Sequence, residues 1–97
     1  MYARVITTQY HPEKMEEGLQ IYREVLAATR QLSGLKGVLG LIDREAGKAM
    51  SITLWDTKAE AQASGAGSAY FQAQLTKFAS VFAAAPVIET YEVVAQE

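Results

Sequence analysis

The chain of 97 residues contains no cysteine, no asparagine and a single histidine, His11. The missing cysteines exclude disulfides, thiol nucleophiles and thiolate metal sites. One histidine, placed before Pro12 at a turn, is expected to be an exposed or capping residue, although an imidazole can also act as a base near neutral pH. We therefore expect no bound metal.

Long hydrophobic runs are also missing. No stretch approaches the roughly 20 apolar residues that a membrane-spanning helix needs, and the first residues lack the apolar core of a secretory signal. We expect a cytoplasmic protein that does not interact with membranes.

Charge of one sign is not in excess. Nine Lys and Arg residues stand against eleven Asp and Glu residues, and the basic ones are scattered along the chain. A nucleic-acid or anionic membrane surface attracts clustered basic residues, so neither is expected as a partner. The Gly65-Ala-Gly67 segment is too short and wrongly placed for a phosphate-binding loop. Flavin, NAD, ATP and haem are likewise not expected, so we expect a protein without a cofactor.

The patterning of the apolar residues predicts an order of elements. Residues 1–97 have the length of one domain, and we expect a single domain. Alternation and β-branched residues predict strands over Tyr2–Tyr10, Val38–Ile42, Ala49–Trp55 and Val87–Ala95. Helical spacing predicts one helix over Glu13–Leu32 and a second one before Pro86, interrupted by two glycines within Ser64–Ser68. The order β-α-β-β-α-β predicts an α+β, ferredoxin-like sandwich, in which both helices cover one face of a four-stranded antiparallel sheet.

Both faces of this sheet need cover. Residues 38–42 are apolar at nearly every position, and the third strand carries Met50, Ile52 and Leu54 on one face. Two helices shield one face only, so we expect a second copy of the chain to cover the other. The sequence therefore predicts a homodimer through the sheet.

Trp55, the only tryptophan, stands at the end of the third strand. Thr57 and Glu60 follow it as a capping box, which starts a helix directly after the strand. An indole at such a junction either fills the core or forms one wall of a cavity for a flat apolar ligand. Because the glycine pair at 65 and 67 loosens the covering helix, we predict that Trp55 borders a pocket.

The order of elements, together with the segments 52–60, 68–73 and 88–93, resembles the antibiotic biosynthesis monooxygenase family of dimeric α+β barrels. The resemblance implies a pocket between sheet and helices. It also implies either oxygenation of phenolic or quinol-like substrates without a cofactor, or binding and degradation of haem. Haem degradation would need a histidine on the second helix, which this chain lacks.

The same resemblance implies functional positions. Trp55 matches a tryptophan that lines the family's cavity, Tyr70 stands where many members have histidine, and Thr7 lies near a first-strand position used by the haem-degrading branch. These three are the catalytic candidates. Trp55 and Tyr70 are also substrate-binding candidates, as are Phe71, Tyr22 and Arg4, the last as a counter-charge if its side chain points inward.

Two functions remain open at this point. The chain could be a monooxygenase that acts on an aromatic substrate in its apolar pocket. Alternatively, it could be a dimeric module without catalytic activity that binds a small hydrophobic molecule. The missing asparagine and helix-two histidine favour the second, and the characterised relatives favour the first.

Overall fold

A computed structural model of the chain describes residues 1–65 and 67–97. The elements in chain order are β1 (Tyr2–Gln9), a 3-10 turn (Pro12–Lys14), α1 (Met15–Thr29), β2 (Leu35–Asp43), β3 (Lys48–Trp55), α2 (Lys58–Ala63), α3 (Ala69–Lys77) and β4 (Val87–Glu92). The predicted β-α-β-β-α-β order is confirmed, with the second helix in two parts on either side of the glycine pair. Ala66, inside the predicted interruption, lies outside the described residues.

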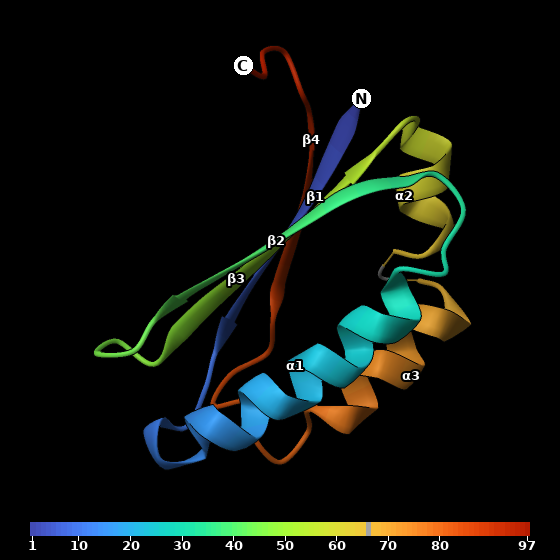
Figure 1. Ribbon diagram of the computed structural model, residues 1–97. Helices are drawn as coiled ribbons and strands as arrows, with labels where there is room; N and C mark the ends of the chain where they lie inside the picture. The colour runs from blue at the N-terminus through green and yellow to red at the C-terminus, as the bar shows by residue number, and fades with distance from the viewer. Residues whose placement is uncertain (66) are drawn as a thin grey trace.

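The strands form one sheet in the order β2-β3-β1-β4, and each neighbouring pair is antiparallel. Figure 1 shows α1 and α3 side by side on one face of this sheet, with α2 near the end of β3. The predicted α+β, ferredoxin-like fold is therefore confirmed.

Side-chain caps start both parts of the second helix. Thr57 Oγ1 accepts a hydrogen bond of 3.1 Å from the backbone N–H of Glu60, and Ser68 Oγ accepts one of 3.0 Å from that of Phe71. The first of these bonds confirms one half of the predicted capping box. The other half differs, because the Glu60 carboxylate accepts from the Thr57 hydroxyl at 3.1 Å and not from a backbone N–H. These caps satisfy N–H groups that have no partner inside the helix.

The second helical region ends earlier than the apolar spacing predicts. α3 stops at Lys77, and the chain then turns back to the end of β1. There Tyr10 and Phe82 form an antiparallel bridge, and the N–H of Ala83 donates to the carbonyl of Gln9 at 2.7 Å. Pairing with β1 satisfies these backbone groups in place of further helical bonds. For a similar reason β4 ends at Glu92, since its partner β1 begins at Tyr2.

The register of the strands decides which side chains face the helices. Arg4 pairs with Thr53, and Ile6 pairs with Ser51, so these residues share the helix-facing side of the sheet. Thr7 pairs with Met50 and therefore lies on the opposite side. Successive side chains of a strand point to opposite faces, which makes this assignment hold along each strand.

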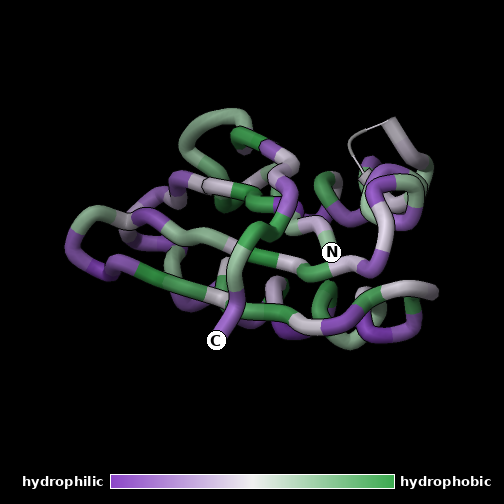
Figure 2. Tube along the Cα trace, turned by 90° about the horizontal axis from the view of Figure 1, so that it is seen from above, coloured by the Kyte–Doolittle hydropathy of each residue, from purple (hydrophilic) through white to green (hydrophobic). Residues whose placement is uncertain are grey.

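We call the side of the sheet away from α1 and α3 the outer face. Figure 2 shows hydrophobic stretches running along the strands. Several large apolar side chains of the outer face are exposed, among them Leu39 (55%), Val87 (56%) and Tyr91 (50%). A contiguous exposed apolar surface of this kind is typical of an interaction site.

One buried cluster lies at one end of the helix layer. Tyr10, Met15, Phe78 and Val81 form one cluster, and Phe82 packs against it. The rings of Phe78 and Phe82 stack with centroids 4.9 Å apart. This cluster joins the end of β1 to α1 and to the segment after α3.

Candidate functional site

A cavity of about 400 Å³ lies between the helix-facing side of the sheet and the helices α1 and α3. Its volume falls within the range of small-molecule sites. Most of the wall is apolar or aromatic, and its polar side chains come from β1, β3, α1 and α3. The lining includes Arg4, Ile6, Thr8, Leu19, Tyr22, Arg23, Leu26, Thr29, Ser51, Thr53, Tyr70, Phe71, Leu75 and Phe78.

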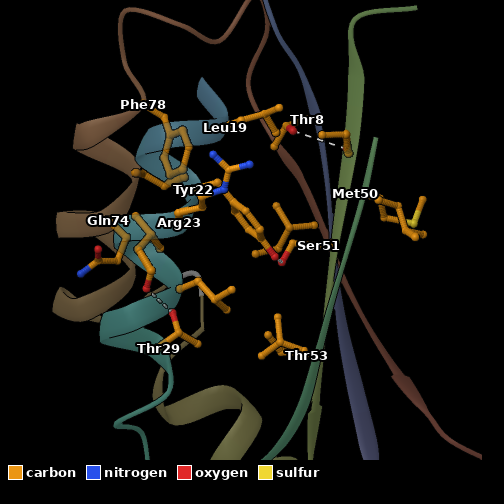
Figure 3. A pocket seen from close by; sticks show the side chains of 18 of the residues that line it. Thr8, Leu19, Tyr22, Arg23, Thr29, Met50, Ser51, Thr53, Gln74 and Phe78 are labelled. Carbon is orange, nitrogen blue, oxygen red and sulfur yellow. Dashed lines mark hydrogen bonds between the residues drawn. The ribbon is translucent and has the colours of Figure 1, made fainter. Parts of the chain in front are cut away.

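One polar pair links α1 to the sheet across this cavity. The Tyr22 hydroxyl lies 3.0 Å from Ser51 Oγ, and the two side chains point toward one another in Figure 3. Gly40 on β2 makes this possible, because a Cβ there would lie 3.0 Å from the Tyr22 ring atom Cε2. With any side chain at this position, the tyrosine ring would have to move back by a few tenths of an ångström.

A second polar pair links α1 to α3. The Tyr70 hydroxyl lies 2.6 Å from Thr29 Oγ1, and the Thr29 hydroxyl also donates to the carbonyl of Val25 at 2.9 Å. A hydroxyl has one proton to donate. Tyr70 therefore donates to Thr29, and its oxygen keeps lone pairs for a ligand. Toward a ligand, Tyr70 is therefore an acceptor rather than a donor.

The buried charged group of the site is Arg4, which is only 4% exposed. Its Nη1 donates to the carbonyl of Ala61 at 2.6 Å and to Ser64 Oγ at 3.0 Å. Its buried Nε has no hydrogen-bond partner. Burial lowers the pKa of Arg4 from its usual value, and the nearby Tyr70 raises it in part. Arginine nevertheless stays protonated in proteins, so the site holds a buried positive charge.

The Arg4 guanidinium rests on two aromatic rings. Its central carbon lies 5.0 Å from the centroid of the Trp55 ring and 5.8 Å from that of Phe71. Both distances are within the range of a cation–π interaction. The side chain points inward, which was the condition for Arg4 to act as a counter-charge.

The prediction that Trp55 borders the pocket is wrong. Its side chain is fully buried, and its Nε1 donates to Thr53 Oγ1 at 2.8 Å. It is not part of the cavity lining, whereas Arg4 and Thr53 are. The guanidinium over the indole takes the position that a ligand ring would need, so the indole fills the core and supports Arg4.

The placement of Thr7 at the site is also wrong, by one residue. Thr7 faces the outer side of the sheet, and its neighbour Thr8 lines the cavity. A shift of one residue along a strand moves a side chain to the other face. Alternation from Arg4 would have identified Thr8, because the two residues are four apart.

Four of the predicted site residues line the cavity together: Arg4, Tyr22, Tyr70 and Phe71. Two further residues that the sequence did not predict, Thr29 and Ser51, contact the two tyrosine hydroxyls. His11 is not part of the lining, and its backbone N–H donates to the carbonyl of Val81 at 3.0 Å.

Among residues 1–65 and 67–97, no group of three or more histidine, aspartate or glutamate side chains could hold a metal ion. In the same part of the chain, each helix is too short or too polar to cross a membrane.

The chain is similar in sequence to two known proteins. No family model matches the chain. Two uncharacterized proteins from two strains of Mycobacterium tuberculosis are each 29% identical over 96 residues, which is 98% of this chain. The chain spans 42% of the length of each of these relatives.

Solved structures agree over almost the whole chain. An antibiotic biosynthesis monooxygenase has a TM-score of 0.79 at 18% identity, with 98% of this chain and 100% of that chain covered. A protein of unknown function from Nitrosomonas europaea has a TM-score of 0.83 at 17% identity, with 99% and 91% covered. The chain therefore has the fold of antibiotic biosynthesis monooxygenases, and the resemblance seen in the sequence is confirmed for the fold.

Proposed function

We propose that the chain is a monooxygenase that needs no cofactor and acts on a phenolic or quinol-like aromatic substrate in this cavity. The observation that carries the proposal is the cavity itself. It has room for a ring system, and aromatic side chains of Tyr22, Phe71 and Phe78 line it. The fold it shares with a protein named antibiotic biosynthesis monooxygenase supports the proposal.

The reaction would draw its electrons from the substrate. An ionised phenol transfers one electron to O2, and the resulting radical and superoxide combine at a ring carbon to give a peroxide. The peroxide anion takes up one proton, equal to the one the phenol gave up on ionising, and then loses water: the ring C–H becomes C=O, one oxygen atom stays in the product and the other leaves in water. The protein would contribute orientation and an environment without bulk water.

The residues of the wall would have distinct tasks. The aromatic rings hold the substrate ring by stacking and apolar contact. The Tyr70 oxygen, whose proton is committed to Thr29, accepts a hydrogen bond from a substrate hydroxyl. This arrangement keeps the ring in one orientation while O2 approaches.

The test is oxygen consumption with a panel of quinols, followed by mass spectrometry of products formed under ¹⁸O2. We expect one labelled oxygen atom in each product. Leu26→Trp fills the cavity from α1 and should abolish consumption. Ala27→Trp, at the next and exposed position of the same helix, is the matched control and should not. Equal loss in both variants, or none in either, would contradict the proposal.

One observation favours the alternative of a module that binds a small hydrophobic molecule without catalysis. In the described part of the chain, the wall carries no histidine, aspartate or glutamate that could act as a base. Saturable ligand binding without oxygen consumption for any quinol would establish this second function.

We also propose that the chain forms a homodimer through the outer face. The exposed side chains of Leu39, Leu41, Val87 and Tyr91 support this, because they form an apolar surface that α1 and α3 do not cover. A second copy would bury this surface by sheet-to-sheet packing.

A further inference from the structure

We propose that the cavity binds its ligand as an anion, with a negatively charged ligand oxygen held by the Arg4 guanidinium. The ligand class is then an apolar molecule with one ionised oxygen: a phenolate, an enolate or a carboxylate. The inference rests on the proposed function in using the same cavity, and it adds the charge and the orientation of the ligand.

The first argument is the incomplete set of partners around Arg4. Buried arginines are usually paired, since an unpaired buried charge is costly. Here Nη1 binds two neutral oxygens, those of Ala61 and Ser64, while Nε is buried without a partner. The ion pairs of the described residues lie elsewhere, at Lys36–Asp56 and Arg44–Glu16. Arg4 therefore lacks the anion that its burial calls for.

The second argument is the charge of the whole wall. The charged side chains among the lining residues are Arg4 and Arg23, so the wall described here carries two positive charges and no negative one. This contrasts with the net charge of -2 of the chain. Arg23 is exposed as well as lining, so it presents its charge to solvent at the cavity. Such a distribution attracts anions into a site with apolar walls.

The positions of Arg4 and Phe78 indicate how the ligand would be oriented in the cavity. Arg4 is bound to the α2 region through Ala61 and Ser64, whereas Phe78 belongs to the core cluster at the end of β1. A ligand with its ionised oxygen at Arg4 would place its apolar body toward Tyr22 and Phe78. The buried positive charge and the apolar wall would then each meet the matching part of one molecule.

The experiment uses the wild-type protein and 4-nitrophenol, whose phenolate absorbs visible light and whose neutral form does not. Absorbance is titrated against pH with and without protein. A nearby opposite charge lowers the pKa of an acid by about 1 to 3 units, whereas burial alone raises it. We expect the apparent pKa of the bound probe to fall by about one unit or more. A raised or unchanged pKa, or the absence of saturable binding, would overturn the inference.

A second measurement compares a carboxylate with its neutral counterpart. Calorimetry should show 2-naphthoate binding at least about tenfold more tightly than 2-naphthamide, since one unit of pKa corresponds to a tenfold change. If nitrophenolate shows the lowered pKa and naphthoate does not bind, the anion is of the phenolate kind. Equal affinity for naphthoate and naphthamide together with an unshifted nitrophenol pKa would contradict the inference.

Variants assign the effect to Arg4. Arg4→Met should remove the pKa shift and the preference for naphthoate, and Arg4→Lys should restore part of both. Arg30→Gln removes an exposed charge from the residue that ends α1, outside the cavity lining, and is the matched control. If Arg4→Met does not fold, the two wild-type measurements still decide.

The outcomes separate this inference from the proposed function. Anion preference without oxygen consumption would leave the anion site and remove the monooxygenase. Quinol oxidation at the same rate in Arg4→Met as in the wild type would leave the monooxygenase and contradict the anion site.

Discussion

The Arg4 guanidinium carbon lies 5.0 Å from the centroid of the Trp55 ring, so the only tryptophan supports the buried cation of the cavity. The indole also donates to Thr53, which lines the cavity beside Arg4. Trp55 therefore does not line the cavity itself but contacts two residues that do. A change at Trp55 would disturb the position of Arg4 as well as the packing of the core.

Trp55→Ala should lower the free energy of unfolding by about 3 to 5 kcal/mol, as large-to-small changes of buried aromatic residues do. The reason is the loss of a fully buried side chain and of the ring under Arg4. Urea denaturation measures the effect. Trp55→Phe keeps an aromatic ring and should cost less. A loss below about 1 kcal/mol for Trp55→Ala would instead favour a position on an open wall.

Gly18→Ala should destabilise the protein although alanine favours helices. A Cβ at Gly18 would overlap the Tyr10 ring and lie 2.8 Å from its Cδ1 atom. Tyr10 is only 3% exposed and cannot turn away freely. Overpacking costs about 1 to 3 kcal/mol, against a gain of about 1 kcal/mol in helix propensity.

Gly67→Ala is the matched control, because no atom lies within 4 Å of a Cβ there. Its effect on unfolding should stay within about 0.5 kcal/mol. A stabilised Gly18→Ala variant would show that the Tyr10 ring moves without cost.

The free energy of unfolding should fall in alkaline solution, in part because the buried Tyr10 phenol resists losing its proton. Burial raises the pKa of the Tyr10 phenol, while a hydrogen bond with Thr8 lowers it in part. Above about pH 10, the usual tyrosine pKa, the unfolded chain loses this proton while the folded chain keeps it. The free energy of unfolding therefore decreases as pH rises from that value toward the raised pKa.

Tyr10→Phe removes this contribution, and its stability should depend less on pH between about 10 and 12 than that of the wild type. Both proteins are compared with their own stability at pH 7, where the phenol is protonated in both states. Equal alkaline slopes would show that Tyr10 titrates alike in the folded and unfolded chain.

Leu39→Lys should disrupt the proposed homodimer. Leu39 is exposed on the outer face, and a lysine there would place a charge within a sheet-to-sheet interface. Analytical ultracentrifugation should show a dimer for the wild type and a monomer or insoluble protein for the variant.

Ala27→Lys puts the same side chain on an exposed position of α1 and should leave the dimer intact. A wild-type monomer at micromolar concentration, or an unchanged dimer in Leu39→Lys, would contradict the proposed interface.

Local signals in the sequence were sufficient for the fold. Alternation in Ala49–Trp55 assigned Thr53 and Met50 to opposite faces. The strand register confirms this, because Thr53 pairs with Arg4 and Met50 pairs with Thr7. The Thr57 cap and the glycine pair correctly marked the start and the interruption of the second helical region. These features depend on residues close together in the chain, so a single sequence contains the information.

The details of the site depended on tertiary packing. Tyr70 and Thr29 are 41 residues apart, and only the packing of α3 against α1 joins their hydroxyls. Likewise, nothing local to Trp55 indicates that Arg4, from another strand, covers its ring. The sequence by itself determined which elements form and which faces are apolar, because these follow from periodicity and caps. The tertiary structure alone decided which side chains border the cavity, because that depends on distances between elements that no local pattern specifies.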